Sequence, residues 1–494
     1  MLEKISQESK CGTEMSMQDK IEELKRLKAR ALLGGGETKI ASQHEKQRLT
    51  ARERIDRLLD EGSFVEMNML VGNRTGTPAD GIITGHGTID GRAVCVYDQD
   101  ATVLGGSTGG EHAMKMYSTI EMALNLRVPL IGLCDSPGYR FPKITEGALR
   151  DEQAAIDFVR QYEPIGAPAV FFPNTEASGI IPQIAGIMGP CAGISVYSPA
   201  LMDFIFMIDK TSYMFITGPR VVKTATSQDI TPEELGGARV HAQISGVADF
   251  RMKSEDDCFS QIKRLLTFLP SNNQGSSPVI DTGDSPDRMV DDIVNIVPDE
   301  SRKGYDMHKV ITTIADNGDF LEVKAEFARE MIVGFARLEG RTVGIVANQP
   351  QYLSGCITID SSDKQARFMR FCDAFNIPLL LLTDTSAYLP GKEQEHKGII
   401  RHGAKVLYAL CEAVVPRVTL ILRKSYGGGQ MAMGVMPGGI GSDLVLAWPT
   451  AEHGALGAEQ AVDLFYGAEI AKAENPQQVR EQLIKDYRQR YANP

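Results

Sequence analysis

The sequence repeats itself at a shift of 249 residues. Residues 85–94 align with residues 334–343, with Gly, Gly-Arg and Val at matching places. The same register, without a gap, matches further pairs: Lys115 with Lys364, Asp135 with Asp384, and Tyr139 with Tyr388. At a second shift, residues 181–184 align with residues 415–418. Because so constant a register is hard to obtain by chance, we expect a tandem duplication of one fold.

Each copy has the pattern of an α/β fold. Apolar runs at 94–97, 130–133 and 184–188 predict buried parallel strands, and helical spacing over 111–125 predicts the helix between the first two. A chain of 494 residues is also too long for one hydrophobic core. The predicted domain limits are 1–40 for an N-terminal helical arm, 41–270 for the first domain, 271–290 for a linker and 291–494 for the second domain.

Composition excludes several classes of protein. The net charge of −12 argues against a nucleic-acid-binding surface. Eight cysteines without a CxxC pair indicate free thiols in a reducing compartment rather than disulfides or a zinc ribbon. No run of 18 apolar residues is present, and residues 1–20 are polar. We therefore expect a cytoplasmic protein without a membrane span.

Four turns of small residues follow apolar strands, two in each copy, at 135–139, 189–193, 384–388 and 426–429. Such turns can direct backbone N–H groups outward at the start of a helix. Two facing turns can form an oxyanion hole, so two pairs predict two holes. Any single turn is more easily explained by packing, and it is the paired repetition that favours function. No HExxH, Walker A lysine or GxGxxG motif is present.

Longer stretches resemble a known family: residues 180–183, 189–193, 197–200, 215–219, 234–238, 371–378, 398–405 and 447–450. They are similar to the carboxyltransferase β subunits of propionyl-CoA and acetyl-CoA carboxylases. The resemblance implies two crotonase/ClpP-like ββα superhelix domains, the first for acyl-CoA and the second for biotin. It also implies a hexamer, a partner chain that carries biotin with a biotin carboxylase, and no metal in this subunit.

The resemblance assigns backbone donors to each hole. The acyl-CoA thioester oxygen would be held as an enolate by Gly138, Tyr139, Ala192 and Gly193. The biotin ureido oxygen would be held by Ala387, Tyr388, Gly428 and Gly429. The family usually has glycine where this chain has Ala387, and alanine fits a positive φ less well, so full activity of the second hole is in question.

Substrate contacts are predicted at Lys115, Arg140, Gln430 and Met431. Lys115 and Arg140, with Lys223 and Arg401, are candidates for holding CoA phosphates, and ordinary surface charge is the alternative for each. Met431 replaces an acidic residue that the family associates with acyl selectivity, so a different or longer acyl group is expected. The alternative is that Met431 and Met433 only pack beneath a helix.

Residues 113–116 spell the biotin-attachment tetrapeptide Ala-Met-Lys-Met. We expect no biotin on Lys115, because it lies in a helical segment whereas biotinyl lysines lie on β-hairpin tips. The histidines at 112, 402 and 453 lack metal-ligand spacing and are interpreted as structural or close to CoA.

Three functions remain open from the sequence. The first is a carboxyltransferase that carboxylates an acyl-CoA. The second is a biotin-dependent decarboxylase subunit that runs the same half-reaction backwards, as in glutaconyl-CoA or methylmalonyl-CoA decarboxylases. The third is a biotin-independent relative, acting on acyl-CoA or an acyl carrier, in which the second hole has decayed. Ala387 and Gln430 are the observations that favour this third function.

Overall fold

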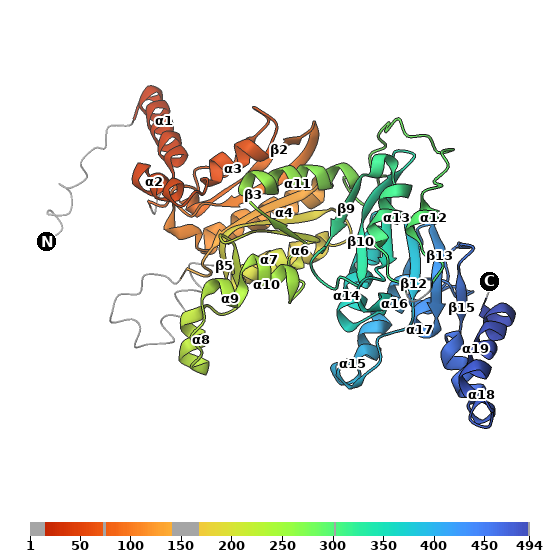
Figure 1. Cartoon of the computed structure of the whole chain (residues 1–494). Coiled ribbons are helices and arrows are strands. Elements are labelled where there is room, and N and C mark those ends of the chain that lie inside the picture. The colour runs from red at the N-terminus through yellow and green to blue at the C-terminus, as the bar shows by residue number, and fades with distance from the viewer. Residues whose placement is uncertain (1–14, 73–75, 141–166, 301–302, 493–494) are drawn as a thin grey trace, which may run out of the picture.

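The computed structural model describes residues 15–72, 76–140, 167–300 and 303–492. Within them, two β-sheets lie side by side, each covered by helices (Figure 1). The N-terminal sheet has the order β1-β2-β3-β4-β5-β6-β8, with β7 paired to β5, and the C-terminal sheet has the order β14-β13-β12-β11-β10-β9, with β15 paired to β13. The predicted α/β duplication of a crotonase-like fold is confirmed.

The strands of the N-terminal sheet are β1 (Val65–Met67), β2 (Ile82–Ile89), β3 (Arg92–Gln99), β4 (Leu130–Ser136), β5 (Gln183–Ala192), β6 (Phe204–Ile208), β7 (Tyr213–Phe215) and β8 (Phe250–Met252). Those of the C-terminal sheet are β9 (Phe320–Val323), β10 (Met331–Leu338), β11 (Arg341–Asn348), β12 (Leu379–Thr385), β13 (Arg417–Tyr426), β14 (Leu444–Ala447) and β15 (Glu452–Gly454).

The helices before the second sheet are α1 (Met17–Leu33), α2 (Glu37–Glu45), α3 (Ala51–Leu58), α4 (Gly110–Leu126), α6 (Phe171–Ala177), α7 (Tyr197–Leu201), α8 (Pro219–Thr226), α9 (Pro232–Gly236), α10 (Ala238–Gln243), α11 (Glu255–Phe268), α12 (Ile293–Ile296) and α13 (Met307–Ile314). The remaining helices are α14 (Ile359–Ala374), α15 (Lys392–Lys397), α16 (Ile399–Glu412), α17 (Gly427–Ala432), α18 (Ala458–Ile470) and α19 (Pro476–Tyr487).

The central strands are parallel and buried, as their apolar runs predict. Strand β3 pairs in parallel with β4, and β4 with β5. Every residue of β4 is buried. Helix α4 makes the crossover between β3 and β4, which is the βαβ unit expected from the sequence. The carboxyl ends of these strands therefore meet at one edge of each sheet.

Backbone geometry confirms the repeat at a shift of 249 residues. Residues with left-handed φ recur in the same register in both halves, as five pairs show: Ala79 and Ala328, Asp90 and Glu339, Leu104 and Leu353, Gly105 and Ser354, and Arg127 and Asn376. Side chains other than glycine rarely adopt this conformation. Turns that share it at matching positions are copies of the same structure. The second shift is also confirmed, because β5 and β13 begin at corresponding residues.

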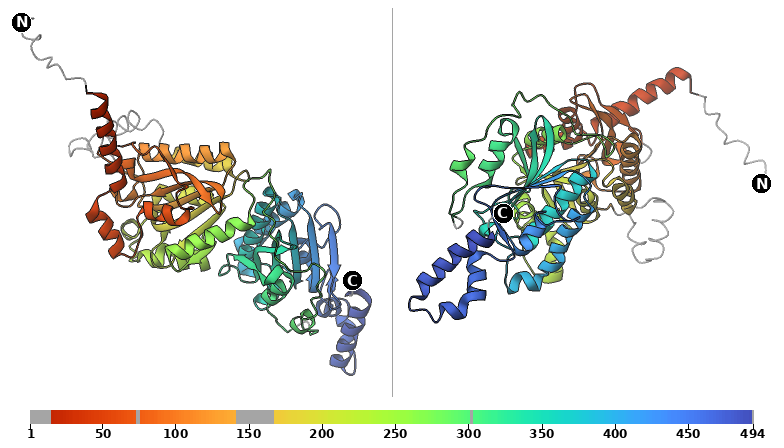
Figure 2. Two further views of the ribbon diagram at one scale, coloured as in Figure 1. Left: turned by 90° about the horizontal axis from the view of Figure 1, so that it is seen from above. Right: turned by 90° about the vertical axis from the view of Figure 1, so that its right-hand side faces the viewer.

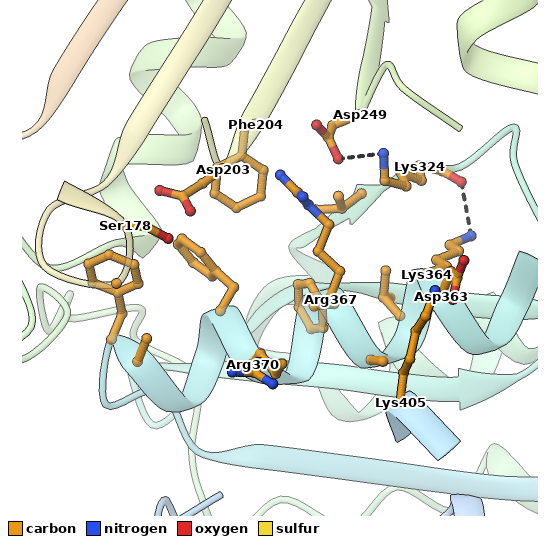
Figure 3. A pocket seen from close by; sticks show the side chains of 18 of the residues that line it. Ser178, Asp203, Phe204, Asp249, Lys324, Asp363, Lys364, Arg367, Arg370 and Lys405 are labelled. Atoms are coloured by element: carbon orange, nitrogen blue, oxygen red, sulfur yellow. Dashed lines mark hydrogen bonds and ion pairs between the residues drawn. The ribbon is translucent and has the colours of Figure 1, made fainter. Parts of the chain in front are cut away.

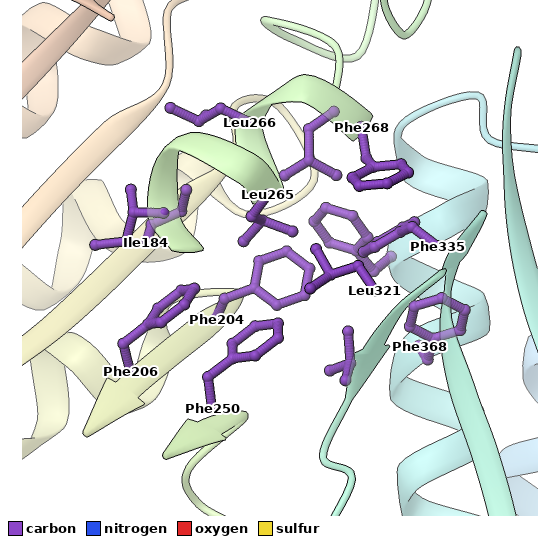
Figure 4. Packing of buried hydrophobic residues seen from close by; sticks show 14 of the residues in the cluster. Ile184, Phe204, Phe206, Phe250, Leu265, Leu266, Phe268, Leu321, Phe335 and Phe368 are labelled. Atoms are coloured by element: carbon purple, nitrogen blue, oxygen red, sulfur yellow. The ribbon is translucent and has the colours of Figure 1, made fainter. Parts of the chain in front are cut away.

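A continuous apolar core joins the two domains (Figure 4). Phe204 of β6 packs edge to face on Phe371 of α14, with ring centroids 4.7 Å apart, and contacts Phe335 of β10 at 6.1 Å. Phe268, at the end of α11, also stacks on Phe335. Such aromatic contacts favour particular ring orientations, so they restrict how the two sheets are placed relative to each other.

The ends of the described chain lie at opposite ends of the molecule, with α1 at one and α19 at the other (Figure 2). Helix α1 begins with a capping box between Ser16 and Asp19. Residues 1–14 of the predicted arm lie outside the described residues. No helix or strand lies between α11 and α12 in the described chain, where the sequence predicts a linker. The domain limits themselves stay a prediction.

One expectation about the turns was wrong in detail. Residues 189–192 are the last residues of β5, so only Gly193 begins a turn there. The apolar and glycine-rich stretch keeps its ladder contacts with β7 almost to its end. In the second copy, by contrast, α17 begins at Gly427 directly after β13, as expected.

Candidate active site

The first predicted pair of turns comes together at the carboxyl ends of β4 and β5. These strands are adjacent, and Ser136 pairs with Cys191. Gly138 comes two residues later with a φ of +116°, a conformation open in practice only to glycine. A Cβ atom on Gly138 would lie 3.0 Å from the Ala192 carbonyl oxygen. The two segments predicted to form the acyl-CoA hole are therefore in contact.

Hydroxyl groups fill the space behind this turn. The Gly138 N–H donates to Ser136 Oγ at 3.3 Å, and Ser195 Oγ donates to the same oxygen at 3.1 Å. Thr108 Oγ1 lies 3.3 Å from Ser195 Oγ, and a bridge joins Thr108 to Tyr139. Sequence reasoning missed these hydroxyls, because serine and threonine are common in turns of every kind.

The second pair of turns has the same arrangement in the other domain. Thr385 at the end of β12 pairs with Ser425 near the end of β13. A Cβ on Gly428 would lie 2.9 Å from the Tyr388 ring, and one on Gly429 would lie 3.6 Å from the carbonyl carbon of Ala387. Both glycines are in the first turn of α17, whose N–H groups have no partner within the helix. The four predicted donors of the biotin hole are thus neighbours.

Ala387 does not have the strained backbone that its replacement of glycine suggests. It is absent from the described residues with positive φ. The expectation that alanine is disfavoured here was therefore wrong. In the first copy the glycine that needs positive φ is Gly138, which corresponds to Ala387 at the shift of 249, so the two turns differ at this residue.

The Tyr388 side chain lies beneath the second hole. Its hydroxyl is buried and has no hydrogen-bond partner among the described residues. Burial raises the pKa of this phenol to about 12. A Cβ on Gly403 of α16 would lie 3.1 Å from the Tyr388 oxygen, so the ring is held between α16 and Gly428. A buried donor without a partner in the described chain is an unusual feature.

Lys115 is not placed to hold a CoA phosphate, which corrects the prediction. Its side chain is 2% exposed, and its ammonium group donates to the carbonyl oxygens of Ala79, at 3.0 Å, and Ile82. Desolvation by burial lowers its pKa to about 8. Lys115 therefore stabilises the loop before β2. Of the other candidates, Lys223 is exposed and pairs with Asp229 at 2.9 Å, and Arg401 is exposed.

Arg140 and Gln430 have partners within the fold in this structure, and their contact with substrate stays a prediction. The Arg140 guanidinium donates to Asp80 Oδ1 at 2.7 Å and to the Ser107 carbonyl at 2.7 Å. Gln430 is 8% exposed, and its amide donates to the Gly454 carbonyl at 3.2 Å, which ties α17 to β15. Gln430 thus has a structural explanation that needs no loss of the second hole.

The two methionines after the second hole behave differently. Met433 is fully buried in the core, as the packing alternative predicts. Met431 is 37% exposed, and its Cε would lie 3.8 Å from a Cβ on Gly428. Met431 is therefore beside the hole predicted for biotin, and its part in acyl selectivity stays a prediction from the family resemblance.

The three histidines singled out in the sequence lie in separate environments. His112 is fully buried against Asp80, and burial lowers its pKa to about 3. His402 contacts Asp363 at 2.9 Å, and His453 lies beside Gln430. No group of three His, Cys, Asp or Glu side chains suited to a metal occurs in the part of the chain that the structure describes.

A cavity of about 710 Å³ lies between the domains (Figure 3). None of the predicted site residues lines it. Its cations are mostly neutralised locally: Lys324 pairs with Asp249 at 2.9 Å, and Lys405 with Asp363 at 2.7 Å. Lys364 donates to backbone carbonyls. Because these cations already have partners in the protein, we interpret the cavity as part of the contact between the two domains.

Comparison with known proteins decides the family. A family model described as carboxyl transferase domain matches residues 42–494. The chain belongs to the carboxyl transferase domain family. It is 47% identical to the carboxyltransferase subunit of propionyl-CoA carboxylase from Haloferax mediterranei, over 97% of this chain and 91% of that one. It is 45% identical to the methylmalonyl-CoA decarboxylase subunit alpha of Propionigenium modestum, over 96% and 90% of the two chains.

A solved structure is similar over the same length. Transcarboxylase 12S, crystallised as a hexamer with methylmalonyl-coenzyme A and methylmalonic acid bound, superimposes with a TM-score of 0.88. The two sequences are 42% identical, and the match covers 97% of this chain and 90% of that one. The predicted family and enzyme class are confirmed: the chain is an acyl-CoA carboxyltransferase. No helix in the described ranges is long and apolar enough to cross a membrane.

Proposed function

We propose that this carboxyltransferase moves a carboxyl group between carboxybiotin, carried on a separate chain, and the α-carbon of an acyl-CoA. The first hole would hold the thioester oxygen with backbone N–H groups of Gly138, Tyr139, Ala192 and Gly193. The second would hold the ureido oxygen of biotin with those of Ala387, Tyr388, Gly428 and Gly429.

The observation that carries this proposal is the duplicated convergence of backbone turns. Gly138 meets Ala192 in one domain, and Gly428 meets Tyr388 in the other. Carboxyl transfer to carbon needs two oxyanions stabilised, one on each reactant, and two similar holes meet that need. Fixed backbone donors stabilise developing negative charge without reorganising, and one donor is typically worth roughly 10²–10³ in rate.

The residues of this chain act by binding and orientation. In the acyl-CoA hole the Gly138 N–H makes a 3.3 Å bond to Ser136 Oγ, near the long limit, which an enolate oxygen would replace with a stronger charge-assisted bond. In the biotin hole the first-turn N–H groups of α17 fit a polar urea oxygen. Carboxybiotin would supply the carboxyl group and, once freed of it, a base for the α-proton.

Propionyl-CoA and methylmalonyl-CoA are the proposed pair of acyl substrates. The relatives named as a propionyl-CoA carboxylase subunit and a methylmalonyl-CoA decarboxylase subunit are about equally similar to this chain. Their names describe the same pair of compounds, with the carboxyl group added in one reaction and removed in the other. A hexamer is proposed from the similarity to transcarboxylase 12S, and a biotin carboxylase with its carrier protein is the proposed partner.

The biotin-independent alternative loses the observations that favoured it. Ala387 has no positive φ, and Gln430 has a structural role. A decarboxylase subunit remains the second candidate, because the half-reaction is reversible and a close relative bears that name.

The test compares two substitutions at one glycine. Gly428→Pro removes the N–H, and proline is tolerated in the first turn of a helix. Gly428→Ala adds the same Cβ beside Tyr388 but keeps the N–H, so it controls for crowding. Loss of carboxyl from methylmalonyl-CoA is followed by mass spectrometry, with and without free biotin. We expect biotin-dependent turnover in the unaltered protein, a fall of roughly 10²-fold or more in Gly428→Pro and a smaller fall in Gly428→Ala. Equal activities of the two variants would contradict the assignment of the second hole.

A further inference from the structure

Each strand pair that leads to a hole is interrupted at an aspartate. Along β4 and β5, Cys134 pairs with Ile187 but Ser136 with Cys191, so Asp135 alone lies opposite residues 188–190. The other domain has the same irregularity, and there Asp384 of β12 lies opposite residues 422–424 of β13. Bulges bend a strand and redirect the residues after them, and they are common next to active sites. The two turns therefore leave their sheets from equivalent bulges.

Both aspartates are held in the same way. The Asp135 N–H donates to Gln99 Oε1 at 3.0 Å, and the Asp384 N–H donates to Asn348 Oδ1 at 3.1 Å. Gln99 and Asn348 are themselves 249 residues apart. The two carboxylates are almost completely buried, with 3% and 0% of their side chains exposed.

Each buried carboxylate is paired with arginine. Asp135 accepts from Arg54 at 3.2 Å and, more closely, from Arg48. Asp384 accepts from Arg423 Nε at 2.8 Å. Although burial lowers the pKa of Arg54, its interactions with Asp98 and Asp135 raise it overall. The arginines are therefore charged partners of the bulge carboxylates.

The arginines come from unrelated places in the sequence. Arg423 stands on β13, in the middle of its own bulge. The corresponding residue of β5 is Gly189, where a Cβ would lie 2.2 Å from Asp135 Oδ1 and 2.3 Å from Arg48 Nη2. In the first domain the cation instead arrives from residues before the sheet, Arg54 on α3 and Arg48 just ahead of it. Duplication alone does not produce the same charge at the same carboxylate by two routes.

Stability is a weak reason for such pairs. Replacing a buried ion pair with apolar residues is often neutral or stabilising, because desolvation offsets the attraction. What a buried pair of fixed geometry provides is position. Asp135 stands three residues before Gly138, and Gly189 three before Ala192, so this pair lies between the two segments of the first hole. In the second domain Asp384 stands three residues before Ala387, and Arg423 stands five residues before Gly428.

We propose that these pairs are positioning devices, Asp135 with Arg48 and Arg54 for the acyl-CoA hole and Asp384 with Arg423 for the biotin hole. The inference rests on the proposed function, because it assigns each pair to one reactant. Each pair fixes the N–H groups of its own hole, so damage to one leaves the other reactant bound normally.

The test uses isosteric substitutions in the full-length protein. For Asp384→Asn we expect kcat/KM for free biotin to fall about 10²-fold, as misplacement by about 1 Å can cost, while the Kd for methylmalonyl-CoA, measured by calorimetry, stays within about twofold. For Asp135→Asn we expect kcat to fall by a similar factor while the KM for biotin is unchanged. A merely structural role would instead change the kinetic and binding parameters of both reactants together, which would overturn the inference.

A second variant guards against misfolding. Asp384→Asn leaves Arg423 buried without its carboxylate, which is strongly destabilising. The double variant Asp384→Asn/Arg423→Gln removes both charges, so it should recover thermal stability but not biotin turnover. Recovery of turnover would show that the ion pair does not position the hole. Absence of biotin-dependent turnover in the unaltered protein would overturn the proposed function, and this inference with it.

A matched control breaks another buried ion pair. Lys324 and Asp249 are 2.9 Å apart, with side chains 9% and 3% exposed. Both line the interdomain cavity, which no residue of the four turns lines. Asp249→Asn should lower the melting temperature while kcat and the KM for biotin stay within about twofold. A loss of turnover in this control equal to that in Asp384→Asn would also contradict the proposal.

Discussion

Lys115 and Lys364, 249 residues apart in the chain, are buried in equivalent positions of the two domains and bond to the same kind of acceptor. The Lys115 ammonium donates to the Ala79 carbonyl at 3.0 Å, and that of Lys364 donates to the Phe327 carbonyl at 2.8 Å. Each side chain is 2% exposed. Both lysines hold the loop that precedes a strand of their own sheet.

This burial predicts that the Ala-Met-Lys-Met tetrapeptide is not biotinylated. A ligase must reach the lysine nitrogen, and Lys115 Nζ is occupied inside the folded domain. Intact mass and a streptavidin blot of protein co-expressed with a biotin ligase should show no biotin. A biotin carrier domain in the same cells serves as the positive control. A biotinylated peptide containing Lys115 would contradict both this prediction and the trans delivery of biotin.

A pH effect on stability is expected from Asp203, beside the interdomain cavity. Burial raises the pKa of this carboxyl to about 7, from an ordinary value of 3.8. Between these values the unfolded chain loses the proton and the folded chain keeps it, so stability falls as pH rises from about 4 to about 7. Asp203→Asn keeps an acceptor for the Gln183 N–H, a bond of 2.9 Å, and removes the charge.

The variant should therefore gain stability relative to the unaltered protein as pH rises. Three pKa units correspond to roughly 4 kcal/mol, and partial exposure makes roughly 2–4 kcal/mol the expected range. Denaturant unfolding at pH 5 and pH 7.5 measures the difference. A stability difference independent of pH would mean that Asp203 titrates near its ordinary value.

The sequence predicts features of the backbone better than it predicts the contacts of side chains. The duplication and the four turns were predictable, because glycine spacing and apolar runs report backbone geometry directly. The partners of the charged and amide groups at the ends of long side chains were not predictable. Lys115, Arg140 and Gln430 were expected at the substrate, yet all three satisfy backbone or carboxylate groups within the fold.

The roles of Arg54 and Arg423 beside the two holes could not be predicted from the sequence, for a related reason. Comparison of the repeats identified Asp135 and Asp384 as a pair, but their cations stand at positions that do not correspond. Only the folded structure brings Arg54 to Asp135, across 81 residues of chain. A repeat alignment detects shared ancestry and cannot detect a charge that two copies acquired separately.

Restoring the usual glycine at the second turn is expected to bring no gain in activity. Ala387 has no positive φ, so Ala387→Gly relieves no strain. Glycine adds freedom to the unfolded chain, and a loss of about 0.5–1 kcal/mol in stability is expected. Steady-state kinetics with free biotin should give a kcat within about twofold of the unaltered protein. A tenfold rise would show that Ala387 restrains the hole during turnover.

Acyl selectivity should respond to Met431 and not to Met433. Met431 is 37% exposed beside Gly428, whereas Met433 is fully buried. In the proposed reaction the acyl α-carbon must meet carboxybiotin at the biotin hole, so an apolar, flexible side chain beside that hole favours a longer acyl group and an acidic one disfavours it. Met431→Asp should therefore shift the ratio of kcat/KM for butyryl-CoA over acetyl-CoA downward by roughly 10-fold or more, the scale of one or two methylene groups.

The control for Met431 is Met433→Leu, which conserves volume in the core. It should change stability by less than about 1.5 kcal/mol and leave the acyl preference unaltered. The measurement is carboxylation of each acyl-CoA with the biotin-carrying partner, or decarboxylation of the matching carboxyacyl-CoAs with free biotin. Because both variants lie on or just after α17, an equal shift in the two would indicate movement of the helix rather than contact between Met431 and the acyl chain.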